Sequence, residues 1–248
     1  MAYSLTIRRS ALHSQHLSSG ASMVKERGWN RPDYYTSVED EVQAICERVG
    51  LSDVSPVTKF DIQGKDTLSA LVRRLSLAAT LQGGQVVRLS PQTLSIDSEQ
   101  NGLDGRLCCL TQDHAFLITP PSTAGEVRQT LSPSNELPPT VTCFHMTDVT
   151  SSFTAVQIVG PQGYELLRKL TSLDLRPTAF PNLSCAQGGV AKVHALVMRA
   201  DVQTQLAYEV YCRREFGEYI WETLHDAGQE FGVVPFGIAA QRQLYAEK

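Results

Sequence analysis

The sequence predicts an α+β fold, with two interleaved lobes that contain antiparallel or mixed sheets and packed helices. Two stretches, 58–75 and 153–170, each read as a strand, a glycine and an amphipathic helix. Such a repeated unit packs its helix on a sheet, so two of them indicate two similar lobes. A further strand and helix follow at 206–211 and 216–227. A chain of 248 residues has the length of one large or two small domains.

Composition excludes several classes of protein. The net charge is −4 and no basic patch stands out, which argues against nucleic-acid binding. No apolar run has the length of a membrane span, and the first residues lack the apolar core of a signal peptide, so we expect a cytoplasmic protein. Six cysteines occur without a C-x-x-C pair, so we expect most of the thiols to be buried and no zinc site.

The N-terminal quarter predicts one clear helix. Ser37 has the side chain of an N-cap, and acidic residues at 39–41 suit the positive end of the helix dipole. Gly50 is expected to end this helix. An apolar stripe fixes its buried face: Val38, Val42, Ile45 and Val49.

Three polar residues near this helix are candidates for a site. His13 and His16 have a spacing that could ligate a metal, but no third ligand is in sight, and we interpret them as a surface pair. Asp53 follows the helix in a turn, where its carboxylate can accept hydrogen bonds from backbone amides. We therefore predict a structural role for Asp53 and no metal site.

The middle of the chain predicts a strand after Gly84 and a hairpin with strands at 106–110 and 115–119. Turn residues at 101–105 precede the hairpin. A helix is expected around Val127 and Leu131, followed by a proline-rich linker at 131–140.

The C-terminal part has the clearest strand and helix patterns of the chain. The strand at 206–211 is rich in aromatic and β-branched residues, and Gly228 is expected to close the next helix in a left-handed conformation. One face of that helix is apolar: Phe216, Ile220, Trp221, Leu224 and Ala227.

These motifs resemble the folate-binding aminomethyltransferase family, whose type member is the T-protein of the glycine cleavage system. The family's Y-E strand and W-E-x-L-x-x-A-G helix match Tyr208-Glu209 and the segment 221–228. The G-W-x-R-P-x-Y-Y segment at 28–35 is closer to the folate domains of sarcosine oxidase and dimethylglycine dehydrogenase. Further matches follow in register: Phe231, Gly232, Pro235, Gly237, Ala240, Leu244 and Glu247.

The resemblance implies binding of tetrahydrofolate and transfer of a methylene or methyl group to it. Glu209 matches the residue that grips the pterin, Tyr208 would form a wall of the pocket, and Asp104 would lie at the transferred carbon. From its strand position alone, Glu209 would be interpreted as a solvated outward residue, because most strand carboxylates are exposed. The resemblance also implies a first lobe of residues 1–52 with 150–248 and a second of 53–149, together one folate-binding module.

Two departures leave the activity open. The family's A-R-D segment is Ala240-Gln241-Arg242 here, and the family's barrel domain would lie beyond residue 248. The alternatives are a non-catalytic folate-binding or structural subunit of a sarcosine oxidase-like or demethylase complex, and a scaffold without folate. A homodimer or a partner subunit is expected at an apolar patch near the C-terminal end: Phe231, Val234, Phe236 and Tyr245.

Overall fold

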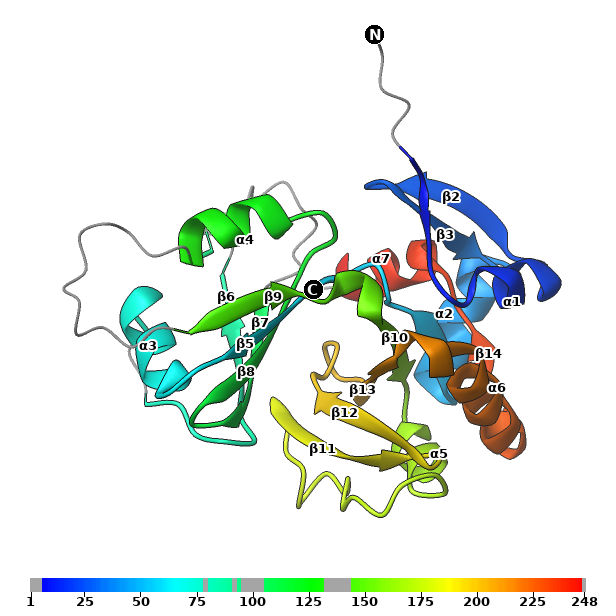
Figure 1. The fold of residues 1–248 in the computed structure, drawn as a ribbon. Helices are drawn as coiled ribbons and strands as arrows, with labels where there is room; N and C mark the ends of the chain where they lie inside the picture. Colours follow the sequence, from blue (N-terminus) through cyan, green and yellow to red (C-terminus); the bar gives the residue numbers. More distant parts are fainter. Residues whose placement is uncertain (1–5, 78–79, 91–92, 95–104, 132–143, 247–248) are drawn as a thin grey trace, which may run out of the picture. The chain divides into compact units, whose positions relative to one another are not determined.

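A computed structural model describes residues 6–77, 80–90, 93–94, 105–131 and 144–246 of the chain. It contains two compact units (Figure 1). Unit 1 comprises Met1–Pro56, Ser151–Asn182 and Ala186–Lys248. Unit 2 comprises Val57–Thr150 and Leu183–Cys185. The predicted α+β class is confirmed, with antiparallel and mixed sheets and helices packed on them.

The larger sheet of unit 1 has six strands in the order β11-β12-β13-β10-β4-β14. Strands β12, β13, β10 and β4 are antiparallel to one another in turn, whereas β14 is parallel to β4. The strands are β4 (Gly50–Asp53), β10 (Phe153–Val159), β11 (Ser184–Val190), β12 (Val193–Arg199), β13 (Ala207–Arg213) and β14 (Val234–Pro235).

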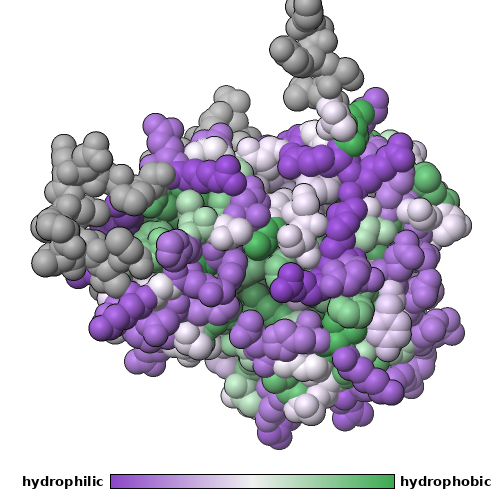
Figure 2. All heavy atoms as spheres, viewed as in Figure 1, coloured by the Kyte–Doolittle hydropathy of each residue, from purple (hydrophilic) through white to green (hydrophobic). Residues whose placement is uncertain are grey.

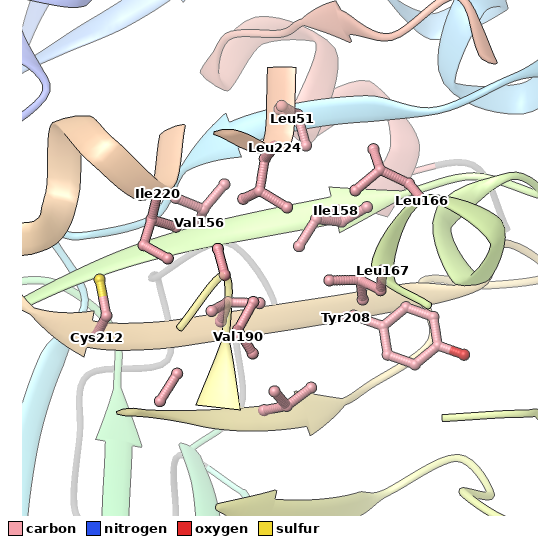
Figure 3. Close-up of a cluster of buried hydrophobic side chains, with 14 of the residues drawn as sticks. Leu51, Val156, Ile158, Leu166, Leu167, Val190, Tyr208, Cys212, Ile220 and Leu224 are labelled. Carbon is pink, nitrogen blue, oxygen red and sulfur yellow. The ribbon is translucent and has the colours of Figure 1, made fainter. Parts of the chain in front are cut away.

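Helices cover both faces of this sheet. On one face, α5 (Gly163–Leu167) and α6 (Gly217–Gly228) pack on Val210 and Tyr208 of β13, and Figure 3 shows Tyr208 beside Leu167. On the other face, α2 (Val38–Glu47) and α7 (Ile238–Ala246) pack on Ala207 of β13 and Val159 of β10. Because side chains alternate along a strand, Glu209 and Tyr211 belong to the face that α2 and α7 cover.

A second, three-stranded sheet in unit 1 has the order β1-β3-β2. Its strands are β1 (Arg8–Arg9), β2 (Ser22–Glu26) and β3 (Trp29–Tyr34), and α1 (His13–Ser18) lies between β1 and β2 in the chain. Trp29 is buried, and the guanidinium of Arg8 stacks 4.6 Å from its ring centroid. The contact between α7 and β3 connects this sheet to the C-terminal helix.

Unit 2 is built on a five-stranded antiparallel sheet in the order β6-β7-β8-β5-β9. Its core includes side chains of the sheet and of both helices, with Phe60, Leu71 and Val127 fully buried. The elements are β5 (Thr58–Gln63), α3 (Thr67–Arg74), β6 (Val86–Leu89), β7 (Gly105–Thr111), β8 (His114–Thr119), α4 (Ala124–Leu131) and β9 (His145–Asp148).

Most predicted elements are confirmed. The two repeated units are β5 with α3 and β10 with α5, and the predicted hairpin is β7 with β8. Ser37 caps α2, since its hydroxyl accepts a hydrogen bond from the Asp40 amide at 3.1 Å. The linker predicted at 131–140 lies, apart from Leu131, outside the described residues.

Two glycine predictions are wrong. Gly50 does not end α2 but opens β4, where a Cβ would lie 2.6 Å from Ile45 Cγ1. Gly228 is right-handed, with φ −86°, and the chain continues as a 3-10 turn over Gln229–Phe231. The left-handed residue is Gly232, with φ 65°. Packing requires glycine at positions 50 and 228. A Cβ on Gly228 would lie 2.7 Å from Val233 Cβ, nearly as close as the contact described for Gly50.

In the part of the chain that the structure describes, no helix is long and apolar enough to cross a membrane. Hydrophilic residues are the most common on the face shown in Figure 2.

Candidate functional site

Glu209 lies at the middle of β13, and only 2% of its surface is exposed. In the sheet register, Gln157 of β10 is its neighbour on one side and Met198 of β12 on the other. A carboxylate at this depth requires hydrogen-bond donors. The structure therefore places Glu209 inside unit 1 and not among solvated strand residues.

Among the described residues, Gln157 and Tyr211 each donate to one oxygen of the Glu209 carboxylate. Gln157 Nε2 donates to Oε1 at 3.3 Å, and the Tyr211 hydroxyl donates to Oε2. Tyr211 is two residues along β13, so both side chains point to the same face of the sheet. Because the donors come from two neighbouring strands, they fix the plane of the carboxylate.

Helix α7 extends this arrangement. Gln241 Nε2 donates to Gln157 Oε1 at 3.1 Å, and Gln157 Nε2 also donates to the Tyr245 hydroxyl oxygen at 3.2 Å. We refer to Gln157, Glu209, Tyr211, Gln241 and Tyr245 as the Glu209 network. It joins β10, β13 and α7 within unit 1.

Arg242 lies outside the Glu209 network. It is exposed and pairs with Glu26 of β2. Glu26 also accepts a hydrogen bond from Arg31 at 2.6 Å. Burial alone would raise the pKa of Glu26, but the charges of Arg31 and Arg242 lower it. The arginine next to Gln241 therefore links α7 to the three-stranded sheet.

Tyr208 occupies the opposite face of the sheet from Glu209. Its ring packs with Leu167 and Ile158 (Figure 3), and its hydroxyl donates to the Leu175 carbonyl at 2.9 Å. Burial raises the pKa of Tyr208 to about 12. The structure does not bring Tyr208 and Glu209 together on one face. Asp104, the third predicted site residue, lies outside the described residues.

A second buried polar cluster corrects the prediction for the histidines. His16 is buried and not a surface residue, because its Nε2 lies 2.9 Å from Asp53 Oδ2 and its Nδ1 2.8 Å from the Tyr35 hydroxyl. The predicted turn role of Asp53 is confirmed, since its Oδ1 accepts from the Ser55 amide at 2.9 Å. Burial by itself would raise the pKa of Asp53, but hydrogen bonds from His16, Ser10 and Ser55 hold it well below its usual range.

The apolar patch predicted near the C-terminal end does not form as expected. Phe236 is 1% exposed and packs in the core with Ile45, while Phe231, Val234 and Tyr245 are half-buried. The large apolar side chains exposed in the described chain lie elsewhere: Ile7, Leu17, Tyr34, Phe216 and Tyr219. Within the described part of the chain, no group of three or more His, Cys, Asp or Glu side chains could hold a metal ion.

Sequence reasoning missed two members of the Glu209 network that the sequence signals. Tyr211 is two positions from Glu209 in a strand, which is the spacing of side chains on one face. Gln157 is a polar residue within the apolar part, 155–159, of β10. No local sequence pattern indicates that Gln241 belongs to the network, because α7 and β10 meet only in the folded chain.

The sequence profile of the family described as the GCVT N-terminal domain matches residues 12–248. The chain belongs to this family. The resemblance drawn from the sequence motifs is thereby confirmed. Among the relatives of this GCVT N-terminal domain are proteins of two kinds.

One kind is the sarcosine oxidase alpha subunit of Corynebacterium sp. strain U-96, which is 29% identical over 97% of this chain and 26% of the relative. The other is aminomethyltransferase, represented by the protein of Koribacter versatilis, 30% identical over 97% of this chain and 63% of the relative. The chain thus spans about a quarter of the former and less than two thirds of the latter.

Solved structures support the same fold. Aminomethyltransferase T of the glycine cleavage system from Bartonella henselae superposes with a TM-score of 0.76 at 18% identity, over 96% of this chain and 62% of that chain. A chain of the heterotetrameric sarcosine oxidase from Corynebacterium sp. U-96 gives a TM-score of 0.62 at 19% identity, over 90% of this chain and 96% of that chain.

Proposed function

We propose that this GCVT N-terminal domain binds tetrahydrofolate and acts as an aminomethyltransferase-like domain. The observation that supports this most directly is the Glu209 carboxylate, buried and held by Gln157 and Tyr211. A buried carboxylate with a fixed plane suits a flat ligand whose edge carries two N–H donors. The pterin ring of folate has such an edge.

In this proposal Glu209 accepts hydrogen bonds from the pterin, and the remaining members of the Glu209 network hold it. Tyr208 supports the site from the other face of β13, where its ring packs against α5 and its hydroxyl fixes the chain at Leu175. It therefore acts as a support of the strand that carries Glu209.

The finer proposal is transfer of a methylene or methyl group to tetrahydrofolate, with Asp104 at the transferred carbon. A carboxylate there would stabilise positive charge on an iminium in the transition state. Aminomethyltransferases among the relatives favour this activity.

A second candidate is a non-catalytic folate-binding subunit of a larger oxidase- or demethylase-like complex. The observation that favours it is Gln241, which stands where the resemblance expects an arginine and bonds Gln157. A neutral amide there supplies no charge to a reacting centre. One relative is a subunit of a sarcosine oxidase, and a structural neighbour is heterotetrameric.

Folinate, a stable reduced folate, tests the shared part of both candidates. We expect it to raise the melting temperature of the wild-type protein, because a ligand that binds only the folded state stabilises it. At 100 times Kd the gain is about 2.7 kcal/mol, which corresponds to roughly 5–10 °C for a chain of this size. The Glu209→Gln variant should lose most of this shift in a thermal melt.

Glu218→Gln is the matched control, because it removes the same charge from an exposed position on α6. It should keep the full shift. A wild-type protein that shows no shift at millimolar folinate would refute folate binding and favour a scaffold without folate.

A further inference from the structure

A chain of side-chain amides connects α7 to the Glu209 carboxylate. Gln241 donates to Gln157, and Gln157 donates to Glu209, over 3.1 and 3.3 Å. The second N–H of Gln157 points to the Tyr245 hydroxyl oxygen at 3.2 Å. Both N–H groups and the carbonyl oxygen of Gln157 are therefore engaged.

The carboxylate determines the direction of this chain. A carboxylate only accepts hydrogen bonds, so the amide that faces it must present its nitrogen. If the Gln157 amide turned over, its oxygen would face the Glu209 oxygen and its nitrogen would face the nitrogen of Gln241. The orientation of an amide is set by its partners, so Glu209 orients Gln157 and Gln157 orients Gln241.

The same dependence runs in the other direction. Because Gln241 occupies the oxygen of Gln157 with a donor, it keeps the nitrogen of Gln157 on Glu209. Tyr211 holds the second oxygen of the carboxylate from β13. A carboxylate fixed from two strands favours a planar ligand edge with two parallel N–H groups over a single ammonium.

We propose that Gln157 and Gln241 are positioning residues that hold the Glu209 carboxylate for the two-donor edge of a planar aminopyrimidine ring, and that Gln241 acts by locking the amide of Gln157. This inference rests on the proposed function, since folate is the ligand concerned. In this proposal α7 takes part in selecting the ligand through Gln241. Arg242 has no such role, because it pairs with Glu26.

The variant Gln241→Glu tests the inference. A carboxylate at 241 cannot donate to the Gln157 oxygen and instead competes with Glu209 for the Gln157 nitrogen, which weakens the hold of Gln157 on Glu209. We expect the Kd for folinate, measured by calorimetry, to rise by about tenfold or more, which is the size of one lost charge-assisted hydrogen bond. Gln241→Arg, which keeps a donor at this position, should stay within a few-fold of the wild type.

Gln243→Glu is the matched control, because it adds the same charge to an exposed position on the same helix. It should leave the Kd unchanged. Equal losses in Gln241→Glu and Gln243→Glu, or no loss in Gln241→Glu, would overturn the inference. Melting curves of each variant show whether it is folded.

A readout without folate separates this inference from the proposed function. The side-chain amide signals of Gln157 in isotope-labelled protein are assigned with a Gln157→Leu variant. We expect Gln241→Glu to shift these signals and to speed their exchange with solvent, and Gln243→Glu to leave them in place. If the wild type binds no folinate, the proposed function fails, while unchanged Gln157 signals in Gln241→Glu would refute the positioning role.

Discussion

His16 and Asp53 form a buried hydrogen-bonded pair whose members are 37 positions apart in the chain. Since Asp53 has a depressed pKa, its carboxylate accepts from His16 Nε2, and the other ring nitrogen, Nδ1, shares a hydrogen bond with the Tyr35 hydroxyl. Burial, together with the charges of Asp53 and Glu41, raises the pKa of Tyr35, so the phenol stays protonated. The three side chains hold α1, β4 and the end of β3 together.

We predict that Asp53→Asn lowers the free energy of unfolding by about 3 kcal/mol at pH 7, the loss expected for one partner of a buried pair. The folded pKa of Asp53 is depressed, so its contribution is complete above the ordinary pKa of about 4 and is lost as the pH falls toward the folded value. Urea unfolding from pH 7 to pH 3 should show the wild type and the variant converging below about pH 4.

Asp226→Asn, at an exposed position on α6, should differ little from the wild type at any pH. A gap between the wild type and Asp53→Asn that is the same at pH 3 and pH 7 would contradict the assignment.

The sequence identified Glu209 as a ligand candidate and Asp53 as a turn residue, because both lie in local motifs. It could not identify the surroundings of His16. Its partners come from β4 and from the chain after β3, and no local pattern encodes contacts at that separation. The same reason hid Gln241, which reaches Gln157 across 84 positions.

At the level of elements, the entry to α7 decides where Gln241 and Tyr245 lie. The Gly237 amide donates to Glu41 of α2 at 2.9 Å, and a Cβ on Gly237 would lie 2.1 Å from the carbonyl oxygen of Asp33. Because that neighbour is backbone, it cannot rotate away. Only glycine therefore allows α7 to approach β3 at this point.

We predict that Gly237→Ala lowers the free energy of unfolding by about 1–3 kcal/mol, the usual cost of overpacking, and weakens folinate binding by moving α7. Chemical unfolding and calorimetry measure the two effects. Gly189→Ala is the control, because a Cβ there meets no atom within 4 Å. Wild-type stability in Gly237→Ala would show that β3 and α7 adjust more readily than the packing indicates.

Elements with a clear hydrophobic period were predicted well, whereas the C-terminal ends of α2 and α6 were not. The cap of α2 follows from Ser37, whose hydroxyl bonds within the same turn. The end of α6 depends on Val233 packing against Gly228, a contact that the helical pattern does not contain. Glycine is therefore needed at position 228 for close packing, whereas the sequence pattern predicted a left-handed helix cap there.

For the whole molecule, the two proposed functions differ in whether the chain transfers one-carbon groups to folate. If the chain transfers one-carbon groups, we predict that Asp104→Ala keeps folinate affinity within a few-fold and reduces turnover by about 10²-fold, the loss typical of an electrostatic group. The assay measures transfer to tetrahydrofolate from glycine-, sarcosine- or methyl ether-type donors. A wild-type protein that binds folinate without any transfer would identify the non-catalytic subunit.

The strand order of unit 1 determines when its six-stranded sheet can form during synthesis on the ribosome. Strand β4 emerges early, yet its two neighbours are Phe153–Val159 and Val234–Pro235. Unit 2 has all five of its strands once residue 148 has been made. A unit can fold only when all of its strands have been made. The sheet of unit 2 can therefore form before the six-stranded sheet of unit 1, although unit 1 begins earlier in the chain. The backbone groups of Gly50–Asp53 therefore stay unpaired until Phe153–Val159 has been made, and an unpaired strand edge can pair with another chain.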